Sequence, residues 1–449
     1  MSQVNPLTRN ARRTTNTMKK VNKVVGVKPT SSSTMTMKTR KVKKGAAGRG
    51  CGGGTRTRAL GDMGVGTERL VNFSAGPACV YEDVLVKAQE DLLNFEKNGL
   101  SVMEMSHRGK AFTRIIEEAE ADLRELLGVP DEYSVLFMQG GATAQFAAVP
   151  YNLGWSDDVT DVGFRPRADY LTTGSWSKKA LAEAKKVGVD ANVVATGDNK
   201  SIPLDAAAWD VNADSGKKSK YFHVCANETI QGVELKGLSP RSVLDEAAGG
   251  IYQGVPLVAD MSSNFCSKPV KVSDYGVIYA GAQKNVGPAG VTIVIVRKDL
   301  LGKVREGTPT MLDWTIMDEN SSLYNTPPCF SIYMCGLVFK HLLSLGGLDK
   351  VEQINKAKCG LLYDTIKQSQ GYYDCPVDPK VRSAMNVPFT IPENPDLEKV
   401  FLQEAEANGL INLKGHRSVG GMRASIYNAM PLEGVEKLVS FMKDFQAKH

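Results

Sequence analysis

The sequence predicts an α/β protein with a mostly parallel main sheet, followed by a smaller α+β C-terminal region. Three observations lead to this fold class. Apolar strand-like runs alternate with amphipathic helix-like runs between residues 70 and 330. These strand-like runs are apolar throughout, which is typical of strands that helices cover on both faces. Beyond residue 331, long helix-like stretches predominate and only two further strand-like runs occur.

The periodicity of the apolar residues assigns the elements in order. In the first part we expect helices at 81–98, 112–127, 177–187 and 240–248, of which the first two end at Gly99 and Gly128. We expect strands at 134–138, 168–172, 192–196, 221–225, 255–259, 277–279 and 291–296. In the second part we expect helices at 331–345, 350–368, 395–407 and 432–447, with strands near 385–391 and 422–427.

The length of the chain predicts more than one domain, because 449 residues exceed what a single hydrophobic core usually supports. We expect a large domain at 69–330, of which 69–87 can pack with the small domain, and a small domain at 331–449. No apolar run is long enough to cross a bilayer, so we expect no membrane association. The eight cysteines form no CxxC pair and no Cys/His cluster, so we expect neither a disulfide scaffold nor a metal site.

Residues 1–68 differ in composition from the rest. Fifteen of the 55 Lys and Arg residues and none of the 49 acidic residues lie in 1–61, so the remainder has a net charge of 40 − 49 = −9. Aliphatic residues are sparse there, and we expect a disordered extension. A basic, Ser/Thr-rich, acid-free N-terminus is typical of an organellar transit peptide, for a plastid or alternatively a mitochondrion. A nucleic-acid-binding arm has similar charge, but this extension has no aromatic residue to stack on bases, so we expect no nucleic-acid partner.

Lys284 stands where a strand-like run gives way to a Gly/Pro-rich loop. A lysine held in a cavity at such a point has a lowered pKa and an amine free for Schiff-base chemistry, although most loop lysines are solvated surface charges. Asp260 directly follows the strand-like run at 255–259. It could cap a helix, or it could meet Lys284 at the same edge of the sheet. A lysine and an aspartate together are the pair that pyridoxal phosphate requires.

Further polar stretches could meet a ligand, and each also has a plainer interpretation. The Gly-Gly pair at 140–141 precedes a helix, where exposed N–H groups bind anions, but it could be only a tight turn. Trp176 could be a core aromatic or a surface on which a cofactor ring stacks. Arg108, Arg417 and Arg423 could be solvated charges or a clamp for carboxylate and phosphate groups.

The chain resembles the phosphoserine aminotransferase family, within the class V aminotransferases, from about Val71 to the C-terminus. The resemblance is carried by a series of ordered motifs. These are Asn-Phe-Ser-Ala-Gly-Pro at 72–77, Ser-His-Arg-Gly at 106–109, Gln-Gly-Gly-Ala-Thr-Ala-Gln-Phe at 139–146, Asn-Glu-Thr-Ile-Gln-Gly-Val at 227–233, Ala-Asp-Met-Ser-Ser at 259–263, Tyr-Ala-Gly-Ala-Gln-Lys-Asn at 279–285, Tyr-Asn-Thr-Pro-Pro at 324–328 and Gly-His-Arg-Ser-Val-Gly-Gly-Met-Arg at 415–423.

The resemblance implies the aspartate-aminotransferase-like fold and pyridoxal phosphate as cofactor. Lys284 would bind the cofactor covalently and shuttle the proton, with Asp260 on the ring nitrogen, Trp176 stacked on the ring and Thr229 at its phenolic oxygen. The residues implied for the cofactor phosphate are Ala142, Thr143, Gln283 and, from the other subunit of a homodimer, Asn325 and Thr326. The residues implied for the substrate anions are His107, Arg108, His416, Arg417 and Arg423. One departure is Ala142, where many relatives have glycine.

The implied reaction moves the amino group of L-glutamate to 3-phosphooxypyruvate, giving O-phospho-L-serine and 2-oxoglutarate, in serine biosynthesis. The same chemistry on 4-phosphohydroxythreonine in vitamin B6 synthesis is a further expectation. Two alternatives stay open. One is another class V enzyme, such as an alanine:glyoxylate aminotransferase or a cysteine desulfurase, for which Cys329 beside a Pro-Pro pair is a poor nucleophile candidate. The other is a nucleic-acid-binding protein that acts through its basic extension.

Overall fold

The structure is a computed structural model that describes residues 69–155, 165–203, 209–210, 218–236 and 252–449. The disorder expected of residues 1–68 and the helix expected at 240–248 lie outside the described residues.

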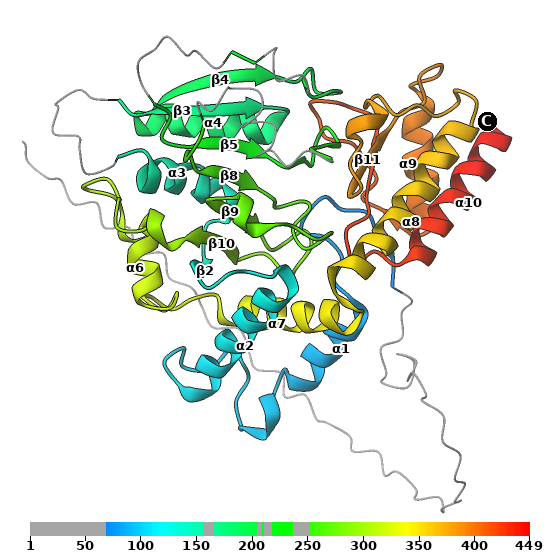
Figure 1. The fold of residues 1–449 in the computed structure, drawn as a ribbon. Helices are drawn as coiled ribbons and strands as arrows, with labels where there is room; N and C mark the ends of the chain where they lie inside the picture. The colour runs from blue at the N-terminus through cyan, green and yellow to red at the C-terminus, as the bar shows by residue number, and fades with distance from the viewer. Residues whose placement is uncertain (1–68, 156–164, 204–208, 211–217, 237–251) are drawn as a thin grey trace, which may run out of the picture. The chain divides into compact units, whose positions relative to one another are not determined.

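A seven-stranded sheet forms the centre of the body, in the order β2-β10-β9-β8-β5-β3-β4 (Figure 1). Its strands are β2 (Tyr133–Met138), β3 (Arg167–Thr172), β4 (Asp190–Thr196), β5 (Phe222–Cys225), β8 (Leu257–Asp260), β9 (Val277–Gly281) and β10 (Thr292–Arg297). Strand β10 runs antiparallel to both of its neighbours, and the strands from β9 to β4 run parallel. The predicted mostly parallel sheet is therefore confirmed.

Both faces of the sheet are covered, which explains why its strands are apolar throughout. Leu257 and Ala259 of β8 join one apolar cluster, with side chains of α2 (Lys110–Leu127) and α7 (Cys329–Ser344). Val258, between them, joins a second cluster with α3 (Gly141–Leu153), α4 (Ser175–Val187) and α6 (Trp314–Glu319). Alternate residues of one strand thus pack on opposite layers, as the period of two in a strand requires.

The first predicted helix is too long. Helix α1 spans Glu82–Asp91, and a separate turn of 3-10 helix, η2, spans Phe95–Lys97. Glu96 and Lys97 have φ values of 46° and 64°, in the left-handed region that ends a helix. The side chain of Asn94 stabilises this turn by accepting a hydrogen bond from the Gly99 N–H at 2.7 Å. The apolar periodicity continues across the break because Phe95 is still buried.

The C-terminal part combines helices with a small antiparallel sheet. Strands β11 (Asn386–Phe389) and β13 (Met422–Ser425) pair beside helices α8 (Gly347–Gln368), α9 (Leu397–Ala407) and α10 (Leu432–Lys448) (Figure 1). Strand β1 (Val71–Asn72) pairs in parallel with β12 (Leu410–Ile411), which ties the start of the body to its end. Residues Glu68–His449 form one contact unit, and the domain boundary near residue 330 stays a prediction.

Short elements complete the described chain. The hairpin β6 (Asn227–Glu228) and β7 (Val233–Glu234) follows β5, and 3-10 turns lie at Val272–Asp274, Lys298–Leu300, Thr310–Leu312 and Pro379–Val381. Within the described ranges no single helix is long and apolar enough to cross a bilayer. Helices α7 and α8 reach that length and composition only as a pair bent by 86°.

Candidate active site

A cavity of about 370 Å³ lies at the carboxyl ends of the parallel strands. Strands β3, β5, β8 and β9 are neighbours in the sheet and point the same way, so the residues that follow them meet at one edge. The predicted residues that line this cavity are Ala142, Thr143, Trp176, Thr229, Asp260, Gln283, Lys284, His416 and Arg423. Residues separated by up to 281 positions in the sequence are thus brought together, as Ala142 and Arg423 show.

Lys284 and Asp260 face the same cavity. The Lys284 Nζ donates a hydrogen bond to the Thr229 Oγ1 at 2.6 Å. Burial lowers the pKa of Lys284, and the negative charge of Asp260 partly opposes that shift. Burial likewise raises the pKa of Asp260, and the positive charge of Lys284 opposes it. The two groups are therefore electrostatically coupled, which the sequence predicted from their positions at adjacent strand ends.

Asp260 does not cap a helix. Its Oδ1 accepts a hydrogen bond from the Ser262 N–H at 2.9 Å, and the residues from 261 to 271 form turns and bends. Its side chain is only 5% exposed, at the bottom of the cavity. Of the two interpretations left open by the sequence, the one that pairs Asp260 with Lys284 is the one that this geometry supports.

Trp176 forms one wall of the cavity and is only partly buried, so it is not a core aromatic. Its ring centroid lies 5.3 Å from the Lys284 Nζ and 4.1 Å from the Lys179 Nζ. The Trp176 Nε1 is buried and makes no hydrogen bond to the described chain. Lys179 also lines the cavity, and sequence reasoning missed it. The signal that could have identified Lys179 is its spacing of three residues from Trp176, which places both side chains on one face of a helix.

The Gly-Gly pair at 140–141 begins helix α3, as predicted, and both residues have positive φ, 91° and 66°. A Cβ at Gly140 would lie 2.5 Å from the Ala144 Cβ, so only glycine fits there. No side chain caps the first turn of α3, and Ala142 and Thr143 line the cavity at that end. Free N–H groups and the helix dipole make this end an anion site. Ala142 does not have a positive φ, so the departure from glycine introduces no strain.

Positive groups gather on another side of the cavity. The Arg423 Nη1 donates to the Thr229 carbonyl oxygen at 3.4 Å, while its Nε is buried without a hydrogen bond to the described chain. Burial and the charges of Arg423, Arg417 and Lys179 lower the pKa of His416. Such a group of cations, one with an unpaired donor, favours an anionic ligand.

Five predicted residues do not line this cavity, and their roles stay predictions: His107, Arg108, Asn325, Thr326 and Arg417. Arg108, Thr326 and Arg417 are exposed. The His107 Nε2 and the Asn325 Oδ1 are each buried without a partner in the described chain. Thr326 lies beside the end of β2, because its carbonyl oxygen accepts a hydrogen bond from the Gln139 side chain at 3.4 Å.

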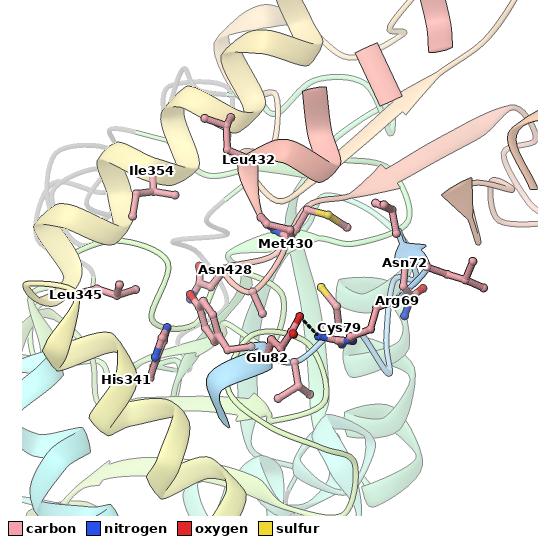
Figure 2. Close-up of a pocket in the computed structure, with 16 residues that line it drawn as sticks. Arg69, Asn72, Cys79, Glu82, His341, Leu345, Ile354, Asn428, Met430 and Leu432 are labelled. Atoms are coloured by element: carbon pink, nitrogen blue, oxygen red, sulfur yellow. Dashed lines mark hydrogen bonds and ion pairs between the residues drawn. The ribbon is translucent and has the colours of Figure 1, made fainter. Parts of the chain in front are cut away.

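A second cavity, of about 390 Å³, lies between the first residues of the body, helices α7 and α8, and residues 428–432 (Figure 2). Apolar side chains such as Leu345 and Ile354 line much of it. At its edge the Arg69 Nη1 and the Glu82 Oε2 form an ion pair at 3.4 Å. None of the predicted site residues lines it, so the first cavity is the candidate active site.

Comparisons with known proteins identify the family of this chain. A model of the family Aminotransferase class-V matches residues 70–438. Phosphoserine aminotransferase 2, chloroplastic, of Arabidopsis thaliana is 59% identical over 386 residues, which are 86% of this chain and 86% of that protein. Phosphoserine aminotransferase of Nitrosomonas europaea is 52% identical over 385 residues, 85% of this chain and 99% of that protein. A solved structure, PLP bound phosphoserine aminotransferase from Trichomonas vaginalis, is 39% identical, with a TM-score of 0.75 over 84% of this chain and all of that one.

The chain therefore belongs to the class-V aminotransferase family and, within it, to the phosphoserine aminotransferases. The predicted family, fold class and aminotransferase activity are confirmed by these matches.

The buried position of Lys284 predicts its titration. Because burial lowers its pKa, the amine of Lys284 should become neutral, and react with an acylating reagent, at a lower pH than surface lysines, which titrate near ~10.4. Asp260→Asn removes a charge that raises this pKa, so the reactivity midpoint should fall further. The measurement is the acylation rate of Lys284 against pH, by mass spectrometry on cofactor-free protein. The exposed Lys271 serves as the control, and a Lys284 midpoint at or above that of Lys271 would contradict the prediction.

Proposed function

We propose that this protein holds pyridoxal phosphate in the 370 Å³ cavity and uses it to transfer amino groups. The observation that carries the proposal is that the amine of Lys284 and the carboxylate of Asp260 face one cavity with Trp176 on its wall. The residues fit the group. A desolvated amine suits the aldehyde, a buried carboxylate suits the ring nitrogen, and the uncapped start of α3 suits the phosphate.

When bound, pyridoxal phosphate supplies an aldehyde that condenses with amines and a protonated ring that withdraws electrons from the substrate Cα. Asp260 keeps that ring nitrogen protonated through its charge. Lys284 would move the proton between the substrate Cα and the cofactor carbon that carried the aldehyde. This transfer requires a neutral amine near neutral pH. The Thr229 hydroxyl, at 2.6 Å from the Lys284 Nζ, keeps the amine directed into the cavity. The N–H groups at Ala142 and Thr143, with the Gln283 side chain, would hold the phosphate.

The substrates that this site suits are L-glutamate and 3-phosphooxypyruvate, with O-phospho-L-serine and 2-oxoglutarate as products. Each carries at least two anionic groups at working pH. Arg423 and Lys179 line the cavity with Trp176 and provide positive charge for them, and His416 lines the cavity as well. Two relatives that are 59% and 52% identical to this chain over most of its length are named phosphoserine aminotransferase, which supports this choice of substrates. The reaction that forms 4-phosphohydroxythreonine from its 2-oxo acid fits the same charges.

We also propose that the protein works as a homodimer. Asn325, Thr326, His107 and Arg108 do not line the cavity of the single chain. Buried atoms without partners at His107 and Asn325 are the state expected of groups that complete a site across a subunit interface. In that arrangement Asn325 and Thr326 reach the cofactor phosphate of the partner chain.

We further propose that residues 1–68 direct the protein to a plastid, with a mitochondrion as the alternative. The basic composition of residues 1–61, which contain no acidic residue, supports this, as does the Arabidopsis relative that is named chloroplastic. A fusion of residues 1–68 to a fluorescent protein should enter plastids of plant cells. A variant with the Lys and Arg residues of 1–61 changed to Gln should stay in the cytosol. Cytosolic fluorescence of the unchanged fusion would refute the proposal.

Lys284→Ala should abolish amino transfer, because Lys179, the other lysine among the described residues that line the cavity, is exposed and does not share the contact of Lys284 with Thr229. The assay is the formation of 2-oxoglutarate from L-glutamate and 3-phosphooxypyruvate, together with the visible absorbance of the purified protein and its thermal unfolding. We expect activity below detection and an unchanged fold. The matched control is Lys271→Ala on the surface. An active Lys284→Ala protein would refute the proposed function.

Arg423→Ala should weaken substrate binding far more than cofactor binding, because the guanidinium faces the open part of the cavity. Loss of a charge-assisted pair predicts a rise in the KM for L-glutamate of about tenfold to a hundredfold. The matched control is Arg382→Ala, since Arg382 is also partly buried and donates to the Val377 carbonyl oxygen at 2.9 Å but does not line the cavity. Equal losses of substrate and cofactor affinity would mean that Arg423 is structural.

A further inference from the structure

Helix α4, which carries Trp176, has an unusual N-terminal cap. Its N-cap residue is Gly174, which has no side chain to accept hydrogen bonds. Instead, the Trp176 N–H donates to the Glu228 Oε2 and the Ser177 N–H to the Glu228 Oε1, both at 2.9 Å. The Ser175 N–H donates to the Gln231 Oε1 at 3.2 Å. The hairpin β6–β7, more than 50 residues away in the chain, thus receives the first donors of α4.

The contact between the hairpin and α4 is close and specific. A Cβ at Gly174 would lie 2.6 Å from the Glu228 Cδ and from the Gln231 Oε1, so glycine is required for the approach. The Ser177 Oγ donates to the Glu228 Oε1 at 2.6 Å. The Gln231 Nε2 donates to the Ser175 Oγ at 2.8 Å, which pairs these two residues in both directions. A shift of the α4 start would break several of these hydrogen bonds together.

Glu228 is fully buried and accepts hydrogen bonds from the first turn of α4. Burial raises the pKa of Glu228, and the hydrogen bonds from Ser177 and Trp176 offset only part of that rise. No ion pair within the described residues involves Glu228. A carboxylate at a helix N-terminus, accepting charge-assisted bonds, is stabilised without a neighbouring cation.

The residues on either side of Glu228 make further polar contacts, and Thr229 lines the cavity. Thr229 accepts the hydrogen bond of the Lys284 amine, and Asn227 donates to the Ser263 Oγ at 2.8 Å. The backbone of one short strand therefore holds Thr229 toward Lys284 while the Glu228 side chain holds the start of α4. The distance of 5.3 Å between the Trp176 ring and the Lys284 Nζ depends on this connection.

We propose that Glu228 is a positioning residue that fixes the Trp176 ring over the cavity at a set distance from Lys284. It acts through the backbone of Trp176 and Ser177 and touches no reacting atom. The flat group that would stack on the Trp176 ring is the pyridine ring of the cofactor, so the inference rests on the proposed function. Loss of the Glu228 carboxylate should loosen the first turn of α4 and lower the affinity for pyridoxal phosphate.

The test compares Glu228→Gln with Glu234→Gln. Glu234 is a matched control, because it lies on the other strand of the same hairpin, opposite Asn227, is 2% exposed and pairs with Lys268 at 2.8 Å, but has no hydrogen bond to α4 within the described residues. Two quantities are measured on the full chain. The first is hydrogen exchange of the amides at 175–177. The second is the dissociation constant for pyridoxal phosphate, by titration of cofactor-free protein.

Glu228→Gln should speed exchange at 175–177 and weaken pyridoxal phosphate binding about tenfold or more, since a charge-assisted bond is lost at each of two amides. Glu234→Gln should change neither quantity. Unchanged exchange and affinity in Glu228→Gln, or equal changes in both variants, would overturn the inference. If the unsubstituted protein binds no pyridoxal phosphate, the proposed function fails instead, and the exchange result still decides whether Glu228 holds α4.

A second variant covers the case in which Glu228→Gln does not fold. Ser177→Ala removes the hydroxyl that donates to the Glu228 Oε1 and accepts from the Thr173 and Gly174 N–H groups, and it keeps both backbone bonds to Glu228. This variant should fold and should speed hydrogen exchange at 175–177. Its dissociation constant for pyridoxal phosphate should lie between those of the unsubstituted protein and of Glu228→Gln. A Ser177→Ala protein with unchanged exchange and affinity would count against the inference.

Discussion

The structure depends on two opposite charges that are buried side by side at adjacent strand ends. Asp260 closes β8, and Lys284 follows β9, its parallel neighbour. Either charge alone would be costly to bury, but each lowers the cost of burying the other. This coupling requires parallel strands, because only then do the two ends meet at one edge of the sheet. It also requires a sheet covered on both faces, since exposure to water would screen the charges.

Polar contacts from distant parts of the chain hold this edge in place. The Asn428 N–H donates to the Asn285 Oδ1 at 3.0 Å, beside Lys284, and the Tyr427 Oη donates to the Ala75 carbonyl oxygen at 2.8 Å. The buried amine of Lys358 in turn donates to the carbonyl oxygens of Tyr427 and Met430. The C-terminal region therefore supports the structure of the site through these hydrogen bonds. It also places the side chain of Arg423 in the lining of the cavity.

The sequence predicts what is local and misses what depends on contacts across the chain. Strands such as 255–259 are predicted because burial on both faces makes every residue apolar, and the polar residue that follows this strand, Asp260, lines the site. The first helix is predicted too long because Phe95 keeps the apolar spacing after the backbone has turned. The two-residue strand at Asn227–Glu228 is too short to have a period, and nothing local to Gly174 reveals a cap 54 residues away. Such partners become visible only once the fold brings them together.

The charged side chains that line the cavity favour one orientation of a bound ligand. Asp260 lines the cavity and is 5% exposed, whereas Glu228 is fully buried at the start of α4 and is not among the residues that line the cavity. The cationic side chains of Arg423 and Lys179 line the same cavity, as does His416. A ligand with a cationic ring nitrogen and anionic substituents binds more favourably with the nitrogen toward Asp260 and the anionic groups toward Arg423 and Lys179 than in the reverse orientation. Burial lowers the pKa of Lys284, the negative charge of Asp260 opposes that shift, and the positive charge of Arg423 adds to it.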